Sequence, residues 1–207
     1  MNNILKNYKP NDIIFLLDLY NSNVSLNKDC IRKQVERLVD KKKLLKYSTG
    51  IYYIPSYSIT GKLNEPNINK VITKKYISSN DEVFGFYSGI TLLYNLGISN
   101  QIPNIKEIVT NKESSRKRVV SINDFNVIIR KPVVEITNSN YKILQLLDLL
   151  KYVDKYRDIS KNDVKQIIYK NYLNYLSMAQ IDKYLSYYPA KVSKIFMEYK
   201  LYEFTQQ

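Results

Sequence analysis

Residues 44–55 of the chain read LLKYSTGIYYIP and directly follow residues 30–43, CIRKQVERLVDKKK. In the first stretch two short runs of β-favouring residues flank a Ser-Thr-Gly turn, whose glycine, Gly50, can adopt a positive φ angle. Pro55 closes the second run, because proline cannot donate a ladder hydrogen bond. The stretch therefore predicts a two-stranded hairpin over residues 44–55.

The residues before this hairpin predict an amphipathic helix that begins near Asn27. Asn27 is a favoured N-cap residue, and Asp29 lies in the first turn, where the helix dipole favours an anion. At 100° per residue the apolar side chains share one face, and the Arg, Lys and Glu side chains project elsewhere. The apolar face comprises Ile31, Val35, Leu38 and, at its margin, Val39.

Two further helices are expected upstream of this one. Residues 10–21, PNDIIFLLDLYN, predict a buried helix, with Pro10 leading in and Asn11 or Asp12 as the cap. Residues 2–8 predict a short helix before it. A polar turn rich in Asn and Ser then leads into the amphipathic helix. Helix, turn, helix and hairpin in this order predict a winged helix-turn-helix.

Basic residues gather in this segment. Residues 28–46 hold eight Lys or Arg and three Asp or Glu, a net charge of +5, within a chain whose formal net charge is +13. Codon bias in an AT-rich genome can raise Lys and Tyr throughout a chain, but it does not explain this local concentration. In a DNA complex the helix would enter the major groove and the hairpin would contact phosphates; otherwise the charged face is simply solvated. The predicted DNA-binding residues are Lys28, Arg32, Lys33, Arg37, Lys42, Lys43, Lys46, Ser48 and Thr49.

The remainder of the chain predicts a larger second domain. The turn-rich residues 56–67 mark the boundary, β-rich runs follow, and helical patterns dominate from about residue 139. The predicted fold class is α+β. We expect a winged helix-turn-helix domain over residues 1–58 and a mixed α/β domain over residues 59–207, whose C-terminal part is all helical.

Several residue types needed for catalysis are absent. The chain has no histidine and one cysteine, which excludes Ser-His-Asp and Cys-His nucleophile systems and His- or Cys-ligated metals. Ser88, in GFYSG, lies one place from the serine position of a G-x-S-x-G elbow, and no base is evident to activate it. Residues 60–62, TGK, lack the upstream glycine of a phosphate-binding loop. We therefore expect no enzymatic activity, no metal and no cofactor.

The same composition limits the cellular setting. No apolar run approaches the roughly 18 residues that a membrane-spanning helix needs, and the polar start of the chain does not resemble a signal peptide. A single cysteine, Cys30, permits no internal disulfide and fits a reducing compartment. We expect a cytoplasmic protein that does not associate with membranes.

Four stretches in a fixed order resemble a known family: GIYYIP (residues 50–55), FGFYSGITLLYNLGISNQIPNIKEIVTN (84–111), RKPVVEIT (130–137) and NYKILQLLDLLKYV (140–153). Together they resemble the DUF6088 family of AbiE-type abortive-infection antitoxins, from about Leu16 to Leu201. The resemblance implies a winged helix that binds operator DNA and represses its own operon. It also implies a C-terminal domain that neutralises a nucleotidyltransferase-like toxin without a stable complex, in type IV toxin–antitoxin phage defence.

Parts of the resemblance also have a purely structural interpretation. In the YSG and NQIP motifs, Gly89 and Gly97 suit unusual backbone geometry, Pro103 suits a turn and Tyr87 suits packing. Ser99 and Asn100 stand where the family's L-G-L-T motif usually has a threonine, so no role is assigned to them.

A different class of function is the alternative: a module that binds RNA or the toxin partner directly. The Tyr-rich residues 172–202 have the aromatic content that interfaces favour, although the same tyrosines would suit a helical core. Residues 112–118, KESSRKR, are either a phosphate-binding or antitoxin surface, or a solvated hairpin tip. The candidate residues of that surface are Lys112, Arg116, Lys117 and Arg118.

Overall fold

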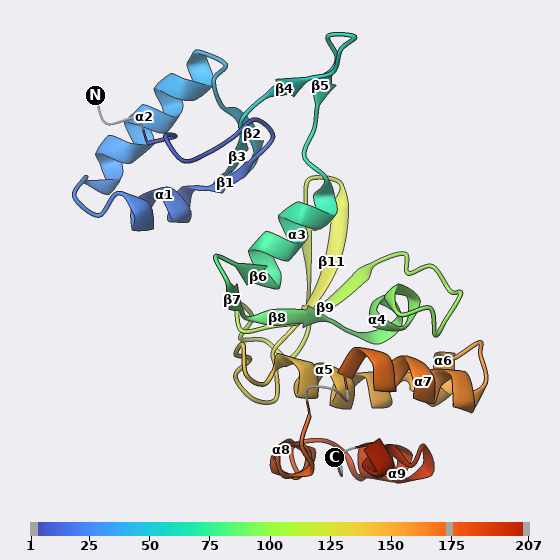
Figure 1. Ribbon diagram of the computed structural model, residues 1–207. Helices are drawn as coiled ribbons and strands as arrows, with labels where there is room; N and C mark the ends of the chain where they lie inside the picture. Colours follow the sequence, from blue (N-terminus) through green and yellow to red (C-terminus); the bar gives the residue numbers. More distant parts are fainter. Residues whose placement is uncertain (1–3, 173–175, 205–207) are drawn as a thin grey trace. The chain divides into compact units, whose positions relative to one another are not determined.

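A computed structural model describes residues 4–172 and 176–204 of the chain. The chain divides into two compact units, Met1–Ile72 (unit 1) and Thr73–Gln207 (unit 2) (Figure 1). Helices alternate with several small sheets along the chain, which confirms the predicted α+β class. In these described ranges no helix has both the length and the apolar character that crossing a bilayer requires.

Unit 1 contains a three-stranded antiparallel sheet in the order β1–β3–β2, together with two helices (Figure 1). The sheet's hairpin confirms the prediction for residues 44–55, and it turns at Gly50, whose φ is 71°. The predicted amphipathic helix is also confirmed. Asn27 caps it as expected, since its side chain accepts a hydrogen bond from the Asp29 backbone at 3.0 Å. The elements are β1 (Ile13–Phe15), α1 (Leu16–Ser22), α2 (Lys28–Asp40), β2 (Leu45–Ser48) and β3 (Ile51–Tyr53).

The prediction of one helix from Pro10 was wrong over its first half. Ile13–Phe15 is strand β1, which pairs with β3, and α1 begins only at Leu16. Ile14 is buried between half-buried neighbours, a period of two that suits a strand. The predicted short helix over residues 2–8 is also absent from residues 4–8, which form a turn; residues 2 and 3 lie outside the described part.

The core of unit 1 lies among the N-terminal turn, both helices and the sheet. α2 contributes the face that its sequence pattern predicts, and β1 and α1 contribute one fully buried residue each. Because the apolar face of α2 is turned inward, its charged residues are left at the surface. The buried cluster comprises Ile4, Ile14, Leu19, Ile31, Val35 and Leu44.

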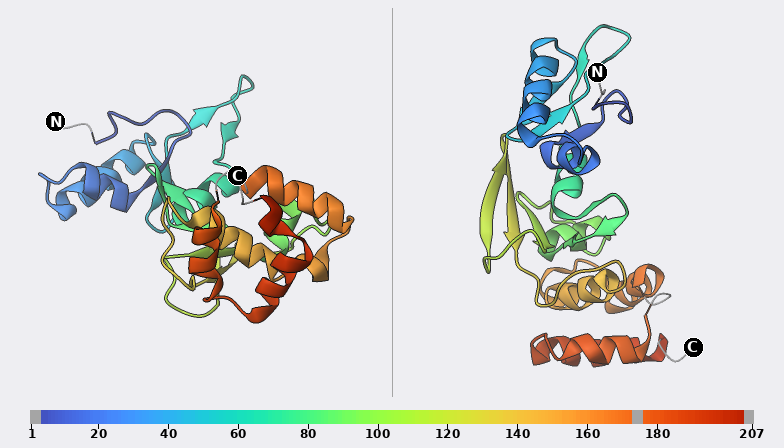
Figure 2. Two further views of the ribbon diagram at one scale, coloured as in Figure 1. Left: turned by 60° about the horizontal axis from the view of Figure 1, so that its bottom comes forward. Right: turned by 90° about the vertical axis from the view of Figure 1, so that its left-hand side faces the viewer.

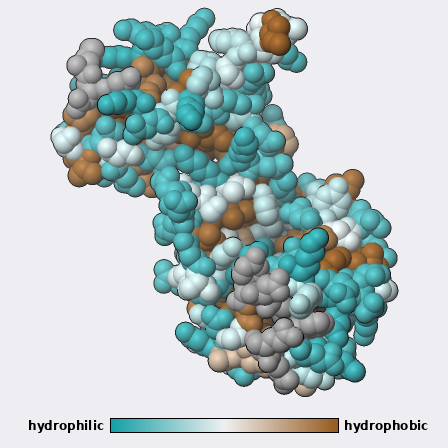
Figure 3. Space-filling view, in the orientation of Figure 1, coloured by the Kyte–Doolittle hydropathy of each residue, from teal (hydrophilic) through white to brown (hydrophobic). Residues whose placement is uncertain are grey.

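A second, smaller hairpin follows in unit 1. Strands β4 (Ser56–Tyr57) and β5 (Leu63–Asn64) pair within the stretch that the sequence suggested was a connector. Apolar surface lies at the hairpin's tip in Figure 3, where the side chain of Ile59 is fully exposed.

Unit 2 is layered. Its main sheet has the strand order β10–β11–β9–β8, in which only the β9–β11 pair is parallel. The views in Figures 1 and 2 show a layer of helices containing α5 against this sheet, and α8 and α9 on the other side of that layer. The strands are β6 (Ser78–Ser79), β7 (Glu82–Val83), β8 (Gly85–Tyr87), β9 (Lys106–Thr110), β10 (Arg118–Ile122) and β11 (Phe125–Arg130). The helices are α4 (Gly89–Asn95), α5 (Tyr141–Leu150), α6 (Val153–Tyr156), α7 (Lys161–Tyr172), α8 (Met178–Leu185), α9 (Ala190–Glu198) and the 3-10 helix η2 (Leu201–Phe204), while α3 (Ile68–Tyr76) runs across the division between the units.

Helix α5 is the centre of unit 2. It packs against β8, α4, α7, α8 and α9, and it is buried almost all round, as an apolar helix between two layers must be. Its start at Tyr141 agrees with the predicted change to helices near residue 139. Of the β-rich run at residues 125–137, FNVIIRKPVVEIT, only Phe125–Arg130 forms a strand, because Pro132 cannot extend a ladder.

Gly85 packs tightly against two other backbone segments, and we expect Gly85→Ala to be strongly destabilising. A Cβ atom there would overlap the carbonyl oxygen of Tyr76 and lie 2.9 Å from that of Val109, and neither backbone atom can rotate away. The expected cost is about 3 kcal/mol in the free energy of unfolding, measured by urea denaturation. Gly97→Ala is the matched control, since it has open space around it and only the strain of a positive φ, about 1 kcal/mol. Equal losses in the two variants would contradict this interpretation.

Candidate nucleic-acid interface and a buried charge cluster

Two of the predicted DNA-binding residues, Lys28 and Arg32, lie on the side of α2 that faces Tyr20 of α1. The Arg32 Nε atom donates a hydrogen bond to the Tyr20 hydroxyl at 2.8 Å, and the Lys28 ammonium lies 5.7 Å from the centre of the same ring. Arg32 also forms an exposed ion pair with Asp29 at 3.4 Å. The Tyr20 hydroxyl, through its hydrogen bond, raises the pKa of Arg32. One tyrosine therefore holds two cations of α2 at the surface.

Three other predicted residues, Lys33, Arg37 and Lys43, line one groove in unit 1, together with Lys41. The groove has a volume of about 810 Å³ and runs beside α2. All four cationic side chains are exposed. Within the described ranges, none of them forms an ion pair with a carboxylate. Their charge is thus available to an external anion.

The last four predicted DNA-binding residues lie in and before the β2–β3 hairpin. Lys42 is exposed and adopts a left-handed backbone with φ of 54° just after α2. Lys46 is exposed on β2 opposite Tyr52, Ser48 is half-buried opposite Ile51, and Thr49 is exposed in the turn. The predicted set therefore falls into three groups within unit 1: the Tyr20 side of α2, the groove, and the hairpin.

The candidate surface at residues 112–118 is a crossover loop, and its interpretation as a hairpin tip was wrong. The loop connects β9 to β10, which are separated by β11 in the sheet. Arg118 is neutralised by the buried carboxylate of Glu113 at 2.9 Å, and the Lys112 ammonium lies 4.6 Å from the centre of the Phe84 ring. The other two predicted side chains, Arg116 and Lys117, are exposed, and neither forms an ion pair or a ring contact with a described residue.

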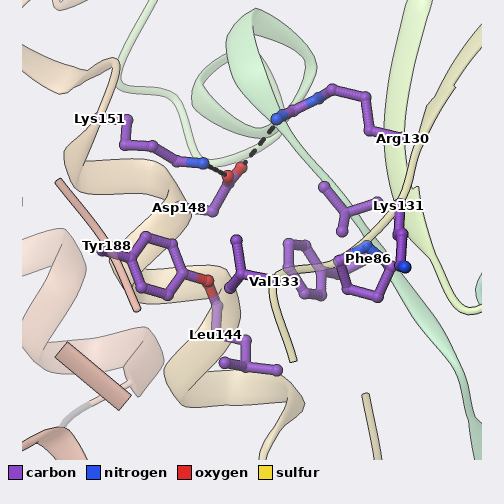
Figure 4. Close-up of a pocket in the computed structure, with 10 residues that line it drawn as sticks. Phe86, Arg130, Lys131, Val133, Leu144, Asp148, Lys151 and Tyr188 are labelled. Carbon is purple, nitrogen blue, oxygen red and sulfur yellow. Dashed lines mark hydrogen bonds and ion pairs between the residues drawn. The ribbon is translucent and has the colours of Figure 1, made fainter. Parts of the chain in front are cut away.

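A buried charge cluster in unit 2 joins the β8–α4 junction, β9, β11 and α5. Figure 4 shows its residues Arg130, Asp148 and Lys151. Asp148 is 2% exposed, and its carboxylate accepts from Ser88, pairs closely with Lys151 and lies 3.6 Å from Arg130. The Arg130 guanidinium also donates to Ser88 and pairs with Glu107 at 2.7 Å. Every charge in the cluster therefore has an opposite charge beside it.

Burial and neighbouring charges shift the pKa values of Arg130 and of two tyrosines beside the cluster, Tyr152 and Tyr188. Burial would lower the pKa of Arg130, but the carboxylates of Asp148 and Glu107 raise that pKa overall. Burial, with a further contribution from Asp148, raises the pKa of Tyr152 to about 12, and the same two causes raise the pKa of Tyr188. At neutral pH the guanidinium is charged and both phenols are protonated.

The contacts of the cluster hold β9, β11, α5 and the residue before α4 together. Ser88 is fully buried, and the Asp148 carboxylate to which it donates also pairs with Lys151 and lies 3.6 Å from Arg130. The adjacent cavity has a volume of about 30 Å³, which corresponds to a single water molecule. Among the described residues no group of three or more potential metal ligands occurs.

A family model supplies the deciding comparison. The model of DUF6088, a family of unknown function, matches residues 1–183. The chain belongs to the DUF6088 family. A comparison with curated proteins finds no match.

The family motifs that sequence reasoning left without a role have structural roles in this DUF6088 chain. Ser88 of the YSG motif belongs to the charge cluster, and Gly89 has a φ of 57° where a side chain would strike Glu107. Before the NQIP motif, Ser99 donates to Asp158 at 2.9 Å, and the Asn100 backbone donates to the same carboxylate at 2.6 Å. The structural interpretation of Gly89 is thereby supported by its backbone geometry.

Sequence reasoning missed most of the charge cluster of this DUF6088 chain. One signal was present: Asp148 interrupts the apolar run ILQLLDLL, and a charge in a helix that is otherwise apolar must find a partner. Arg130, at the end of FNVIIR, is a second charge that ends an apolar run. What the sequence does not show is that these two residues, from β11 and α5, meet at Ser88.

Proposed function

We propose that this DUF6088 protein is a DNA-binding transcriptional repressor that serves as the antitoxin of an AbiE-like, type IV toxin–antitoxin system. In this proposal unit 1 is a winged helix-turn-helix that binds the operator of its own operon. The larger unit neutralises a nucleotidyltransferase-like toxin, without enzymatic activity or a cofactor, in the cytoplasm.

The observation that carries the proposal is the order of elements in unit 1. A strand, two helices and a hairpin follow one another, and the first strand pairs with the last to give the sheet order β1–β3–β2. In helix-turn-helix proteins the second helix reads the major groove, and α2 occupies that position. The hairpin follows it after four residues, which supports its interpretation as a wing.

The distribution of charge supports the same assignment. Exposed cations lie along α2 and on the hairpin, and those that line the groove beside α2, called here the α2 groove, have no carboxylate partner among the residues described. Lysine and arginine side chains in such positions bind phosphates, and arginines that reach base edges select sequence. We assign sequence selection to Arg32, Lys33 and Arg37, and phosphate binding to Lys42, Lys43 and Lys46.

A gel shift on the DNA upstream of the protein's own operon tests the repressor half of this proposal. At about 150 mM salt, specific binding should exceed binding to a random duplex of equal length by at least about 100-fold. Equal affinity for both duplexes would remove the proposed repressor function.

Tyr20 allows a finer prediction on the same surface. Tyr20→Phe removes the hydroxyl that accepts from Arg32 but keeps the ring beside Lys28. We expect operator affinity to fall about three- to tenfold, because Arg32 loses a partner that holds it in place, while affinity for random duplex and thermal stability stay unchanged. Tyr57→Phe, on the exposed β4–β5 hairpin, is the matched control. An equal fall in affinity for both duplexes would show that Tyr20 does not help to select sequence.

Direct binding to the toxin is the second candidate function, and the apolar part of the α2 groove favours it. A pull-down of the product of the neighbouring reading frame tests this alternative. A stable stoichiometric complex would support it and would contradict neutralisation without a complex. Rescue of growth by co-expression in the absence of any complex would support the type IV proposal.

A further inference from the structure

The α2 groove is an open cavity of unit 1. Its volume of about 810 Å³ lies in the range of sites that bind ligands. The N-terminal turn forms part of its lining and α2 forms most of the rest. The lining residues are Ile4, Leu5, Asn27, Asp29, Cys30, Lys33, Gln34, Arg37, Leu38, Lys41 and Lys43.

The α2 groove combines apolar and cationic surface. Ile4, Leu5 and Leu38 line it and also belong to the core of unit 1 or pack against that core, so their positions are fixed by the fold. A phosphate backbone has no apolar group that would cover these side chains. DNA alone therefore leaves part of the groove without a complementary surface, and a ligand with both apolar and anionic groups would cover all of it.

Three of the four cations of the α2 groove form a line. Lys33, Arg37 and Lys41 recur at every fourth residue, so they follow one side of the helix about 6 Å apart and span about 12 Å. The one acidic residue in the lining, Asp29, already pairs with Arg32 at 3.4 Å. A ligand therefore meets an excess of positive charge along one wall of the groove.

We propose that the α2 groove binds an extended acidic peptide segment of a partner protein, in which carboxylates alternate with apolar side chains. In an extended chain every second side chain points the same way, about 6.6 Å apart, which matches the spacing of the cations. The intervening apolar side chains then face the wall that contains Ile4 and Leu5. A length of 12 Å corresponds to about four extended residues.

Binding of such a peptide would compete with DNA. Lys33 and Arg37 line the α2 groove and are also assigned to sequence selection, so both ligands use the same charges. This competition rests on the proposed function, whereas peptide binding itself does not. A partner carrying the acidic segment would thus release the repressor from its operator.

The test uses the full-length chain and three labelled peptides, each acetylated and amidated at its ends. Glu-Leu-Glu-Leu-Glu-Leu carries both features, Gln-Leu-Gln-Leu-Gln-Leu lacks the charge, and Glu-Ser-Glu-Ser-Glu-Ser lacks the apolar groups. Fluorescence anisotropy at about 150 mM salt measures their affinities. We expect the first peptide to bind at least about tenfold more tightly than either of the others, which corresponds to 1.4 kcal/mol or more.

Substitutions in the groove and the reactivity of Cys30 show where the peptide binds. The triple substitution K33A/R37A/K41A should lower the affinity at least tenfold, while K170A/K183A/K191A, with the same loss of charge on exposed residues of unit 2, should not. Cys30 is the only cysteine, is exposed and lines the α2 groove, so the bound peptide should slow its reaction with a maleimide. Circular dichroism checks that both triple variants are folded.

Three results would overturn this inference: similar binding of all three peptides, equal loss of affinity in both triple variants, or binding that leaves the reactivity of Cys30 unchanged. The DNA result is separate. If the wild-type chain binds the first peptide as expected but shows no preference for its operator, the proposed repressor function fails and the peptide site stands. If it binds its operator but none of the peptides, the peptide site fails alone.

Discussion

Replacing Asp148 with alanine should lower the free energy of unfolding by about 3–5 kcal/mol, the cost of removing one partner from a buried ion pair. The carboxylate is nearly inaccessible to water and is shared by Arg130, Lys151 and Ser88. After its removal Lys151 loses its ion-pair partner and Arg130 keeps only Glu107. Two cations would then be incompletely neutralised inside unit 2.

Urea denaturation followed by circular dichroism measures this loss, with Asp182→Ala as the matched control. Asp182 is an exposed aspartate on α8, so its replacement should change the free energy of unfolding by no more than about 0.5 kcal/mol. Asp148→Asn keeps the shape of the side chain but not its charge, so its loss in the free energy of unfolding should lie between those of Asp148→Ala and Asp182→Ala. A loss in Asp148→Ala no larger than in the control would show that the buried charges contribute little to the stability of unit 2.

Removing the cations of α2 should have the largest effect on DNA binding. We expect R32A/K33A/R37A to weaken operator binding by about 100-fold or more, since each arginine or lysine that pairs with a base contributes about 1–3 kcal/mol of discrimination. The preference for the operator over a random duplex should fall with it. Gel shifts on both duplexes, at several salt concentrations, measure affinity and preference together.

The three lysines assigned to phosphate binding give the matched comparison for that experiment. K42A/K43A/K46A removes the same charge from residues assigned to phosphates, so operator and random duplex should weaken about equally. The slope of the logarithm of the binding constant against the logarithm of the salt concentration should become about three units shallower, one unit for each lost phosphate contact. Identical behaviour of the two triple variants would contradict the division of roles between α2 and the hairpin.

Local sequence signals were sufficient for most elements of unit 1. Asn27 caps α2 as its residue type suggests, and a turn with glycine at positive φ separates β2 from β3. The helix prediction failed at Ile13–Phe15 for a long-range reason. This apolar run forms a strand because it pairs with β3, about forty residues later in the chain. A run of three residues carries no periodicity that separates strand from helix, so tertiary pairing decided the outcome.

The sites were less predictable than the elements. Helical spacing placed Lys33 and Arg37 on the outer side of α2. It gave no indication of the groove beside them or of the hydrogen bond from Arg32 to the Tyr20 hydroxyl. The buried cluster is a meeting of β8, β9, β11 and α5, so no local pattern contains it. At residues 112–118 a basic run suggested a binding surface, while the sheet order and the Glu113–Arg118 pair show a loop that is partly neutralised.

Lysine acetylation of the full-length chain, read by mass spectrometry with and without saturating operator duplex, tests most directly which surface contacts DNA. We predict that the duplex slows acetylation of Lys33, Lys43 and Lys46 in unit 1 and leaves Lys183 and Lys191 on the C-terminal helices unchanged. Protection confined to the C-terminal lysines, or no protection of the first three under conditions where the duplex is bound, would contradict DNA binding through α2 and the hairpin.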